Sequence, residues 1–335
     1  MHVSLVNPLT PPDMGRHTAR DWFFRPKVQK PIVIFTFAVL PVFMLVLFTY
    51  LPFFKMVEFS FYNMSYTKNK GFYGLKNYID IFMKPEYFAT FKVSLFYMAG
   101  ALVQTALALY FATVLSFKTR LAAVYKGAMF FPFLVNGIAI GFIFKFFYTR
   151  GFVLDTVLKG LGLSLESLPW WLRDTSINNW SLVATSLWKY MGQNMVLFAG
   201  AIMSVDPNLY EAASIDGANR WHQFRYVILP SISTVLTLNV ILSITGSLSA
   251  FEPPYVITSM GGNGTATYFI KMHEAAHVLH KVGFASAMAV VLIIIIAIVT
   301  VIQKLVFKYA FRDAGTDSPT TRKGGMRQRR QGRAM

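Results

Sequence analysis

The chain has 335 residues, of which 55% are hydrophobic and only 14% are charged, and its formal net charge at pH 7 is +17. A soluble protein of this length would carry far more charge, so the composition indicates an integral membrane protein. Cysteine is absent, which excludes disulfide bonds and cysteine-ligated metal centres.

The first segment, residues 1–30, is polar and contains prolines, five Lys or Arg residues and mixed charge. It lacks the apolar core of about 7–15 residues that marks a cleavable signal peptide. We therefore expect a cytoplasmic N-terminal segment, and we expect the first membrane helix to direct insertion.

Six apolar stretches follow, each near the length of about 20 residues with which a helix crosses a bilayer. The fourth is the least apolar, because it carries Lys189, Gln193 and Asn194. The pattern predicts an all-α, polytopic membrane protein with six transmembrane helices. The expected spans are Pro31–Leu51, Phe91–Phe117, Gly127–Tyr148, Trp180–Met203, Ile232–Phe251 and Phe284–Phe307.

Basic residues gather in three places beside these spans. They are the N-terminal segment, the loop with Lys118, Arg120 and Lys126, and the tail from Lys304 onward, which has nine basic and two acidic residues. Lys and Arg in short flanks mark the cytoplasmic side. Six spans put all three places on one side, so we expect both termini in the cytoplasm, although five lysines against three acids in the first outer loop oppose this weakly.

The positive charge is therefore explained as a topology signal, and nucleic-acid binding is not expected. Residues 309–335 form a low-complexity basic tail, which we expect to be disordered beside an anionic leaflet.

The stretch HEAAH (His273–His277) matches the HExxH zinc pattern, and "IDG" around Asp216 could supply the aspartate of an intramembrane metalloprotease. Zinc ligands lie about 2 Å from the metal, but the fifth span separates the two motifs by ~30 Å of hydrocarbon. His280 could still add a third nitrogen, so adventitious metal binding stays open. We expect a short polar segment here without a metal, and a zinc protease is the unfavoured alternative.

The loop between the fourth and fifth spans reads as a helix–turn–helix on the cytoplasmic face. Asp206 is a predicted N-cap with Pro207 in the first turn, and Gly217 permits a left-handed residue that stops the helix. A second helical run should end at Pro230 and places three apolar side chains on one face. These are Trp221, Phe224 and Val227. From the residues alone, a lever that docks on a partner and a connector lying on lipid are both open.

This loop resembles the EAA loop of ABC importer permeases, whose pattern is EAA, three residues, Gly, nine residues and then Ile-x-Leu-Pro. The chain departs from it only by Val227 in place of Ile. The matching residues are Glu211-Ala212-Ala213, Gly217 and Leu229-Pro230.

"IDGA" after the EAA resembles the carbohydrate-uptake branch of that family. Further matching pieces are "GLKNY" (Gly74–Tyr78), "FFPF" (Phe130–Phe133) and "AFEPPYVITSMGGNG" (Ala250–Gly264). The resemblance covers residues 31–308, which implies a permease domain with its EAA loop at 206–230.

The resemblance implies that the EAA helices fit a cleft of an ATP-binding subunit, whose closure would switch the spans between inward- and outward-facing states. The implied coupling residues are Glu211, Ala212, Ala213, Asp216, Gly217, Leu229 and Pro230. The chain has no Walker-type phosphate loop, so we expect ATP and Mg to be bound by the partner subunits. It would hold no cofactor and would not be an enzyme by itself.

Polar residues inside spans are costly and usually face a cavity or another helix. The polar and aromatic residues expected along the substrate path are Phe133, Gly137, Ser186, Lys189, Tyr190, Asn194, Asn239, Ser243, Ser247 and Phe251. The resemblance implies seven of these, all except Asn194, Asn239 and Phe251. Hydrogen bonding between helices remains an alternative for any single serine. Lys189 could snorkel, form an ion pair or contact an acidic sugar such as a uronic oligosaccharide.

The resemblance implies an importer of sugars or oligosaccharides in a bacterial cell membrane. Its expected partners are a second homologous permease, two ABC ATPase subunits, a solute-binding protein outside the cell and the lipid bilayer. The loop with Gly261, Gly262 and Gly264 would face the binding protein. A permease for another solute, such as glycerol phosphate, is the alternative, and the sugar itself is not identified.

Overall fold

The computed structural model describes residues 26–117 and 120–310, so most of the N-terminal segment, Lys118 and the tail beyond residue 310 lie outside it. The chain divides into two compact units, Met1–Glu58 and Phe59–Met335. In the first, α2 (Pro26–Leu45), the π-turn η1 (Val46–Tyr50) and α3 (Leu51–Phe59) follow one another without a break. Their apolar side chains from Ile34 to Phe54 are exposed, as expected of a helix surrounded by lipid.

The second unit begins with an antiparallel hairpin of β1 (Tyr62–Ser65) and β2 (Lys68–Phe72), followed by α4 (Lys76–Met83) and α5 (Pro85–Phe88). Asn77, the asparagine of "GLKNY", is buried and donates hydrogen bonds to the carbonyls of Ser60 and Tyr62 at 2.8 and 3.1 Å. A buried amide that satisfies two backbone carbonyls holds the hairpin against α4.

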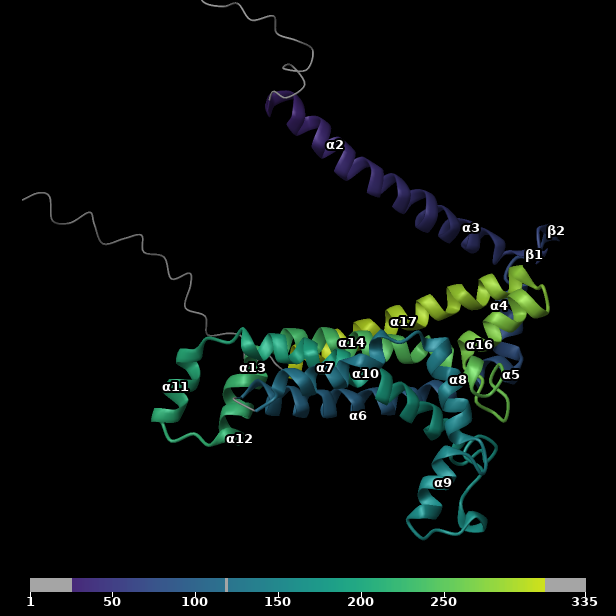
Figure 1. Ribbon diagram of the computed structural model, residues 1–335. Coiled ribbons are helices and arrows are strands. Elements are labelled where there is room, and N and C mark those ends of the chain that lie inside the picture. Colours follow the sequence, from purple (N-terminus) through teal and green to yellow (C-terminus); the bar gives the residue numbers. More distant parts are fainter. Residues whose placement is uncertain (1–25, 118–119, 311–335) are drawn as a thin grey trace, which may run out of the picture. The chain divides into compact units, whose positions relative to one another are not determined.

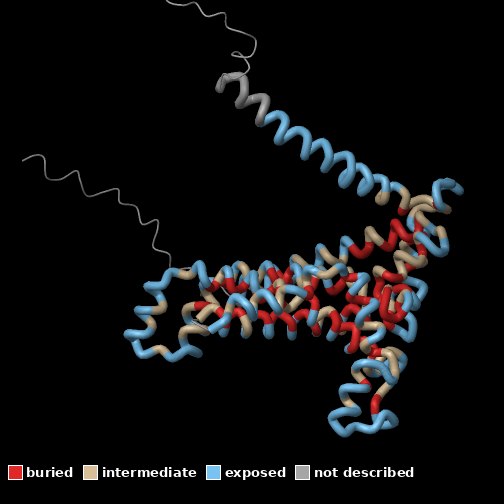
Figure 2. The backbone as a smooth tube through the Cα atoms, in the orientation of Figure 1, coloured by how far each residue is buried: buried red, intermediate tan, exposed pale blue. Residues whose placement is uncertain are grey.

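The long helices of this unit are α6 (Phe91–Ser116), α7 (Ala122–Leu134), α8 (Gly137–Tyr148), α10 (Asn178–Met203), α14 (Ser233–Leu248) and α17 (Val282–Ala310). α10 packs on α6 and α7, whereas α14 packs on α6 and α17 (Figure 1). Buried residues are concentrated where these helices face one another (Figure 2). Small residues allow the close approach: the Cα of Gly192 on α10 lies against the backbone of Met129 on α7.

The connection between α8 and α10 forms a small lobe with α9 (Val153–Gly160) and the 3₁₀ turn η2 (Leu165–Ser167). Asp155 is 1% exposed and accepts hydrogen bonds from the Trp171 indole and the Gly151 amide, each at 2.7 Å. The Arg150 guanidinium lies 3.8 Å from the same carboxylate. These donors satisfy the buried charge and fix the lobe.

After α14 the chain forms α15 (Glu252–Val256), α16 (Tyr268–His273) and the π-turn η4 (Glu274–Val278). Within the described residues, four helical segments are long and apolar enough to cross a membrane. They are Ile34–Phe59, Pro85–Ser116, Ser233–Val256 and Val282–Tyr309. α10 has sufficient length, at 26 residues, but is not among the four. Six spans therefore remain a prediction.

The span predicted over Gly127–Tyr148 is not one continuous helix. α7 and α8 are separate helices with a 97° bend between them, and together they make at most a fifth, broken span of the described residues. Pro132 removes a backbone donor near the end of α7, and the Asn136 side chain caps α8 by accepting from the Ile138 amide at 2.8 Å. A proline followed by a capping asparagine ends one helix and starts another.

Two glycines of α10 give a test of the helix packing. A Cβ at Gly192 would overlap the Met129 carbonyl, whereas one at Gly200 would meet no described atom within 4 Å. Because overpacking costs about 1–3 kcal/mol, Gly192→Ala should lower the thermal unfolding midpoint of the purified protein and Gly200→Ala should not. Equal midpoints would show that α7 does not approach α10 in this way.

Candidate functional site

The first candidate site is the connection between α10 and α14. α11 (Pro207–Ile215) is capped by the Asp206 carboxylate, which accepts from the Asn208 amide at 2.9 Å, as the sequence predicts. After α11 the chain turns at Gly217, whose φ of +77° is a left-handed value that favours glycine. The two helices of this connection are therefore separated by a tight turn that a larger residue would strain.

The second helix begins with α12 (Arg220–Gln223), capped by Asn219, and continues through the π-turn η3 (Phe224–Ile228) into α13 (Leu229–Ser231). The expected end at Pro230 is wrong by one residue. Within η3 the Leu229 amide bonds back to Phe224, five residues earlier, so the regular α-helical pattern has already shifted before Pro230. Proline, which lacks an amide hydrogen, is tolerated there.

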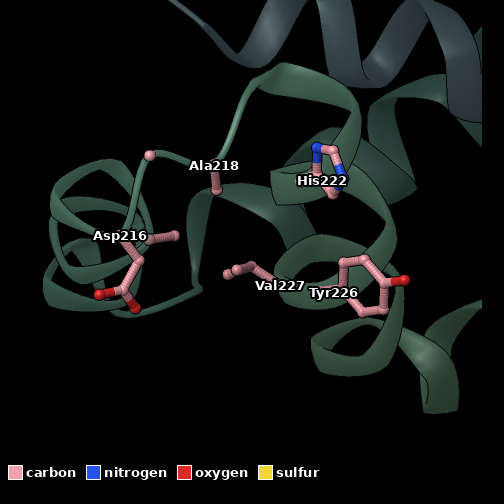
Figure 3. A pocket seen from close by; sticks show the side chains of 7 residues that line it. Asp216, Ala218, His222, Tyr226 and Val227 are labelled. Atoms are coloured by element: carbon pink, nitrogen blue, oxygen red, sulfur yellow. The ribbon is translucent and has the colours of Figure 1, made fainter.

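A hollow of about 370 Å³ lies between the two helices (Figure 3). The His222 and Tyr226 rings stack on one side of it at 6.1 Å, and Asp216 lies on the other. Its lining residues are Ala213, Asp216, Gly217, Ala218, His222, Tyr226 and Val227. Alanine and glycine leave the backbone accessible, so a partner side chain could enter here.

Exposed side chains surround this hollow. Ile215 is 86% exposed and Trp221 is 62% exposed, and Glu211 is exposed on α11. Figure 2 shows the whole connection as mainly exposed at one end of the second unit. Large apolar side chains left open beside a carboxylate are typical of a surface that binds another protein.

The same connection is anchored firmly to the long helices. Ile228 is fully buried among Ala112 of α6 and Phe198 of α10. The Tyr210 ring packs 6.4 Å from Phe117, at the end of α6, and burial raises the pKa of its hydroxyl. A movement imposed on the exposed face would therefore be passed to α6 and α10 through packed side chains.

The second candidate site is an ion pair among the long helices. Lys189 on α10 is 8% exposed, and its ammonium lies 2.7 Å from the carboxylate of Glu252 at the start of α15. The Glu252 side chain is 41% exposed. Of the fates expected for Lys189, ion pairing is the one observed. Pairing offsets the cost of placing a charge among apolar helices.

Aromatic rings lie near this pair. The Lys189 ammonium is 5.0 Å from the centre of the Tyr190 ring, and Tyr190 lies 6.2 Å from Phe133 of α7. Phe251, which precedes Glu252 in the chain, stacks on Tyr255 at 4.7 Å and 25°. Three residues expected on the path, Phe133, Tyr190 and Phe251, thus lie near a fourth, Lys189, and its partner Glu252.

Gly137, also expected on the path, lies directly against the Glu252 carboxylate at the start of α8. A Cβ at this position would overlap the carboxylate atoms. The absence of a side chain therefore makes room for Glu252 beside the bend between α7 and α8.

The remaining path residues do not join this cluster. Asn194 and Asn239 form a separate buried pair, in which the Asn239 amide donates to the Asn194 side-chain oxygen at 3.0 Å. The Ser247 hydroxyl donates to the Ser243 carbonyl, and the Ser186 hydroxyl to Leu182, all within their own helices. The polar stripe on α14 is thus engaged in bonds of its own helix and, through Asn239, in one bond to α10.

Glu252 was missed as a site residue from the sequence. The signal was present in "AFEPPYV", where an acidic residue follows Phe251 immediately before two prolines. What could not be read was its partner, because Lys189 lies 63 residues earlier.

The histidines do not assemble a metal site. His273 and His277 lie 4.6 Å apart as ring centres, but His280 packs on Tyr66 at 4.2 Å, and Glu274 pairs with Lys271. Among the described residues no three His, Cys, Asp or Glu side chains are placed to hold one ion. Burial, and then His277, lower the pKa of His273. Figure 1 places α11 and α16 at opposite ends of the second unit, so Asp216 is far from HEAAH.

The sequence pattern of the family described as "Binding-protein-dependent transport system inner membrane component" matches residues 104–309. This range is more than half of the chain and contains both candidate sites. The chain therefore belongs to this family of ABC transporter permeases, which are non-catalytic, multi-pass membrane subunits.

The names of similar proteins agree with the family. The probable ABC transporter permease YurN of Bacillus subtilis is 29% identical over 287 residues, which are 84% of this chain and 97% of that protein. The arabinooligosaccharide permease AraP of Halalkalibacterium halodurans is 30% identical, over 66% of this chain and 71% of its own. GgtC of Synechocystis, an uptake permease for osmoprotective compounds, is 30% identical over 68% of this chain and 82% of its own.

Solved structures have the same fold. A crystal structure of a bacterial ABC transporter that imports the acidic polysaccharide alginate contains a chain that matches 87% of this one and 99% of itself, with a TM-score of 0.72. At 14% sequence identity the match supports the fold alone.

Gly137 gives a test of the ion-pair site. Gly137→Ala should push Glu252 away from Lys189 and lower the uptake rate about tenfold, the effect of losing one charged hydrogen bond. Gly246→Ala on α14 is the matched control, because a Cβ there meets no described atom within 4 Å. Uptake is compared in cells that hold equal amounts of each variant, and equal rates would place Glu252 elsewhere.

Proposed function

We propose that this chain is the permease subunit of an ATP-driven, binding-protein-dependent importer of sugars or oligosaccharides. The observation that carries the proposal is the exposed helix–turn–helix around Glu211, anchored to α6 and α10 by Ile228 and Tyr210. The names of two relatives support the substrate class: AraP is named as a permease for arabinooligosaccharides, and AmyD as a probable permease for starch degradation products.

In this proposal the helix–turn–helix is the surface on which an ABC ATPase subunit docks. Glu211 would pair with a basic or N–H-rich partner surface, and Ala212 and Ala213 would permit close approach. The open hollow beside Asp216 and Gly217, with Leu229 and Pro230 at the base of the second helix, would receive a partner side chain. Closure of two such ATPases on ATP and Mg would rotate the lever and switch the spans between their two states.

The proposed assembly contains a second homologous permease, two ATPase subunits and a solute-binding protein. An alginate transporter of the same fold has been crystallised with its sugar-bound periplasmic protein. We place the chain in a bacterial inner membrane with both termini in the cytoplasm and with α10, which packs against α6, α7 and α14, as the polar fourth span.

An importer of another solute remains the second candidate, because GgtC is named for osmoprotective compounds rather than oligosaccharides. The phosphate of a glycerol phosphate would need an unpaired cation along the path, and Lys189 is already paired. A zinc protease is not favoured, because His273 and His277 lack a third ligand among the described residues.

Removing the Glu211 carboxylate tests the coupling role. Glu211→Ala should abolish the stimulation of ATP hydrolysis by sugar-loaded binding protein, while the subunit still inserts and assembles. The control is Glu166→Ala, which removes an exposed carboxylate from η2, in the connection between α8 and α10. The readout is ATPase activity of the complete transporter in vesicles, and normal stimulation of the Glu211→Ala form would refute the coupling role.

The chain has no cysteine, so single cysteines report the topology directly. We expect Ile215→Cys, at a position 86% exposed, to react with a membrane-impermeant maleimide only after the cells are opened. Leu161→Cys, at a position 76% exposed, should react in intact spheroplasts. The opposite pattern would place the helix–turn–helix outside the cell, where no ATPase could reach it.

A further inference from the structure

The Lys189–Glu252 pair combines two features that proteins use to bind sugars. It offers a carboxylate, and aromatic rings lie near it: the Tyr190 ring, which packs with Phe133, is 5.0 Å from the Lys189 ammonium, and Phe251, which precedes Glu252 in the chain, stacks on Tyr255. Flat aromatic faces suit the C–H surfaces of a sugar ring, and carboxylate oxygens accept hydroxyl protons.

The Glu252 carboxylate has an unused acceptor. Lys189 bonds to Oε2 at 2.7 Å and is its only hydrogen-bond partner among the described residues. Pro253 and Pro254 follow directly, so the amides that usually serve a carboxylate at a helix start are missing. With 41% of the side chain exposed, the carboxylate is accessible from outside the chain, and no described residue bonds to Oε1.

The charge of the site is already balanced. Lys189 is almost fully buried and neutralises Glu252, so the pair carries no net charge. A carboxylated sugar would bring a second anion next to Glu252 and would compete for one ammonium. An unbalanced charge in this setting is expensive, whereas a neutral hydroxyl loses nothing by bonding to Oε1.

We propose that Glu252, positioned by Lys189 and given room by Gly137, accepts hydroxyl hydrogen bonds from an uncharged sugar and selects it over acidic sugars. The inference rests on the proposed sugar-import function and names the substrate class within it. Lys189 is then a positioning residue, and it is not a receptor for uronic acids.

Binding is tested on the complete transporter in lipid nanodiscs, without its binding protein, by saturation-transfer NMR. The probes are the neutral trisaccharides maltotriose and arabinotriose and the acidic trigalacturonate. We expect at least one neutral probe to bind wild type, trigalacturonate to bind more weakly, and Glu252→Gln to weaken the neutral probe about tenfold or more, as the loss of a charged acceptor implies.

Glu274→Gln is the matched control, because Glu274 also pairs with a lysine at 2.7 Å, Lys271, and takes no part in the Lys189–Glu252 pair. A second variant separates substrate contact from charge balance. If Glu252 only neutralises Lys189, the double variant Lys189→Met with Glu252→Gln should bind the neutral probe like wild type. If Glu252 contacts the sugar, binding stays weak in the double variant.

Tighter binding of trigalacturonate by wild type, unchanged neutral binding in Glu252→Gln, recovery in the double variant, or no binding of any probe would each overturn the inference. None of these results would change the outcome of the Glu211 test of coupling. Sugar-stimulated ATP hydrolysis with a failed Glu252 test would leave the importer in place and remove only this selection role.

Discussion

The fold depends on one constraint: the polar side chains of α10 cannot face hydrocarbon. An unpaired charge or amide within a membrane is costly, so each must meet another helix or a cavity. α6, α7 and α14 pack around α10, and the start of α15 brings Glu252 to Lys189. Asn194 meets Asn239 of α14 in the same way. The polar side chains of α10 thus determine which helices pack against it.

Close packing of this kind needs small residues at the contacts. Without hydrophobic force between helices in lipid, association depends on fitting surfaces and polar bonds. Gly192 lets α7 approach α10, and Gly100 of α6 lies against Val183 of α10. Gly137 performs a different task, because it leaves space for a carboxylate rather than for a helix. Glycine therefore allows close helix packing at Gly192 and leaves room for a side chain of the candidate path at Gly137.

The two candidate sites are linked by α10. Its C-terminal end packs with Ile228 and Tyr210 of the helix–turn–helix, and Lys189 lies farther along the same helix. In the proposed function, a rigid helix with the docking surface at one end and the charged pair along its length connects ATPase docking to the substrate path. Packed interfaces change between discrete arrangements rather than bending continuously, which suits a transporter with two states.

The sequence by itself determined what is local. The Asp206 cap, the left-handed turn at Gly217 and the approximate ends of most long helices follow from residue type and spacing, because caps and apolar runs act within a few residues. The matching EAA spacing also identified the family. The sequence analysis missed one local feature, the bend after Pro132. A proline can either kink a helix or end it. Here the helix ends, because the Asn136 side chain caps a new helix.

Only the tertiary structure decided which polar groups meet. Lys189 had three possible fates in the sequence and one partner in the fold, Glu252, which is 63 residues away. Likewise His280, which follows HEAAH and could have completed a metal site, packs on Tyr66 instead. Helical periodicity states which residues share a face of one helix, but the rotation of each helix against its neighbours is set by packing across the whole bundle.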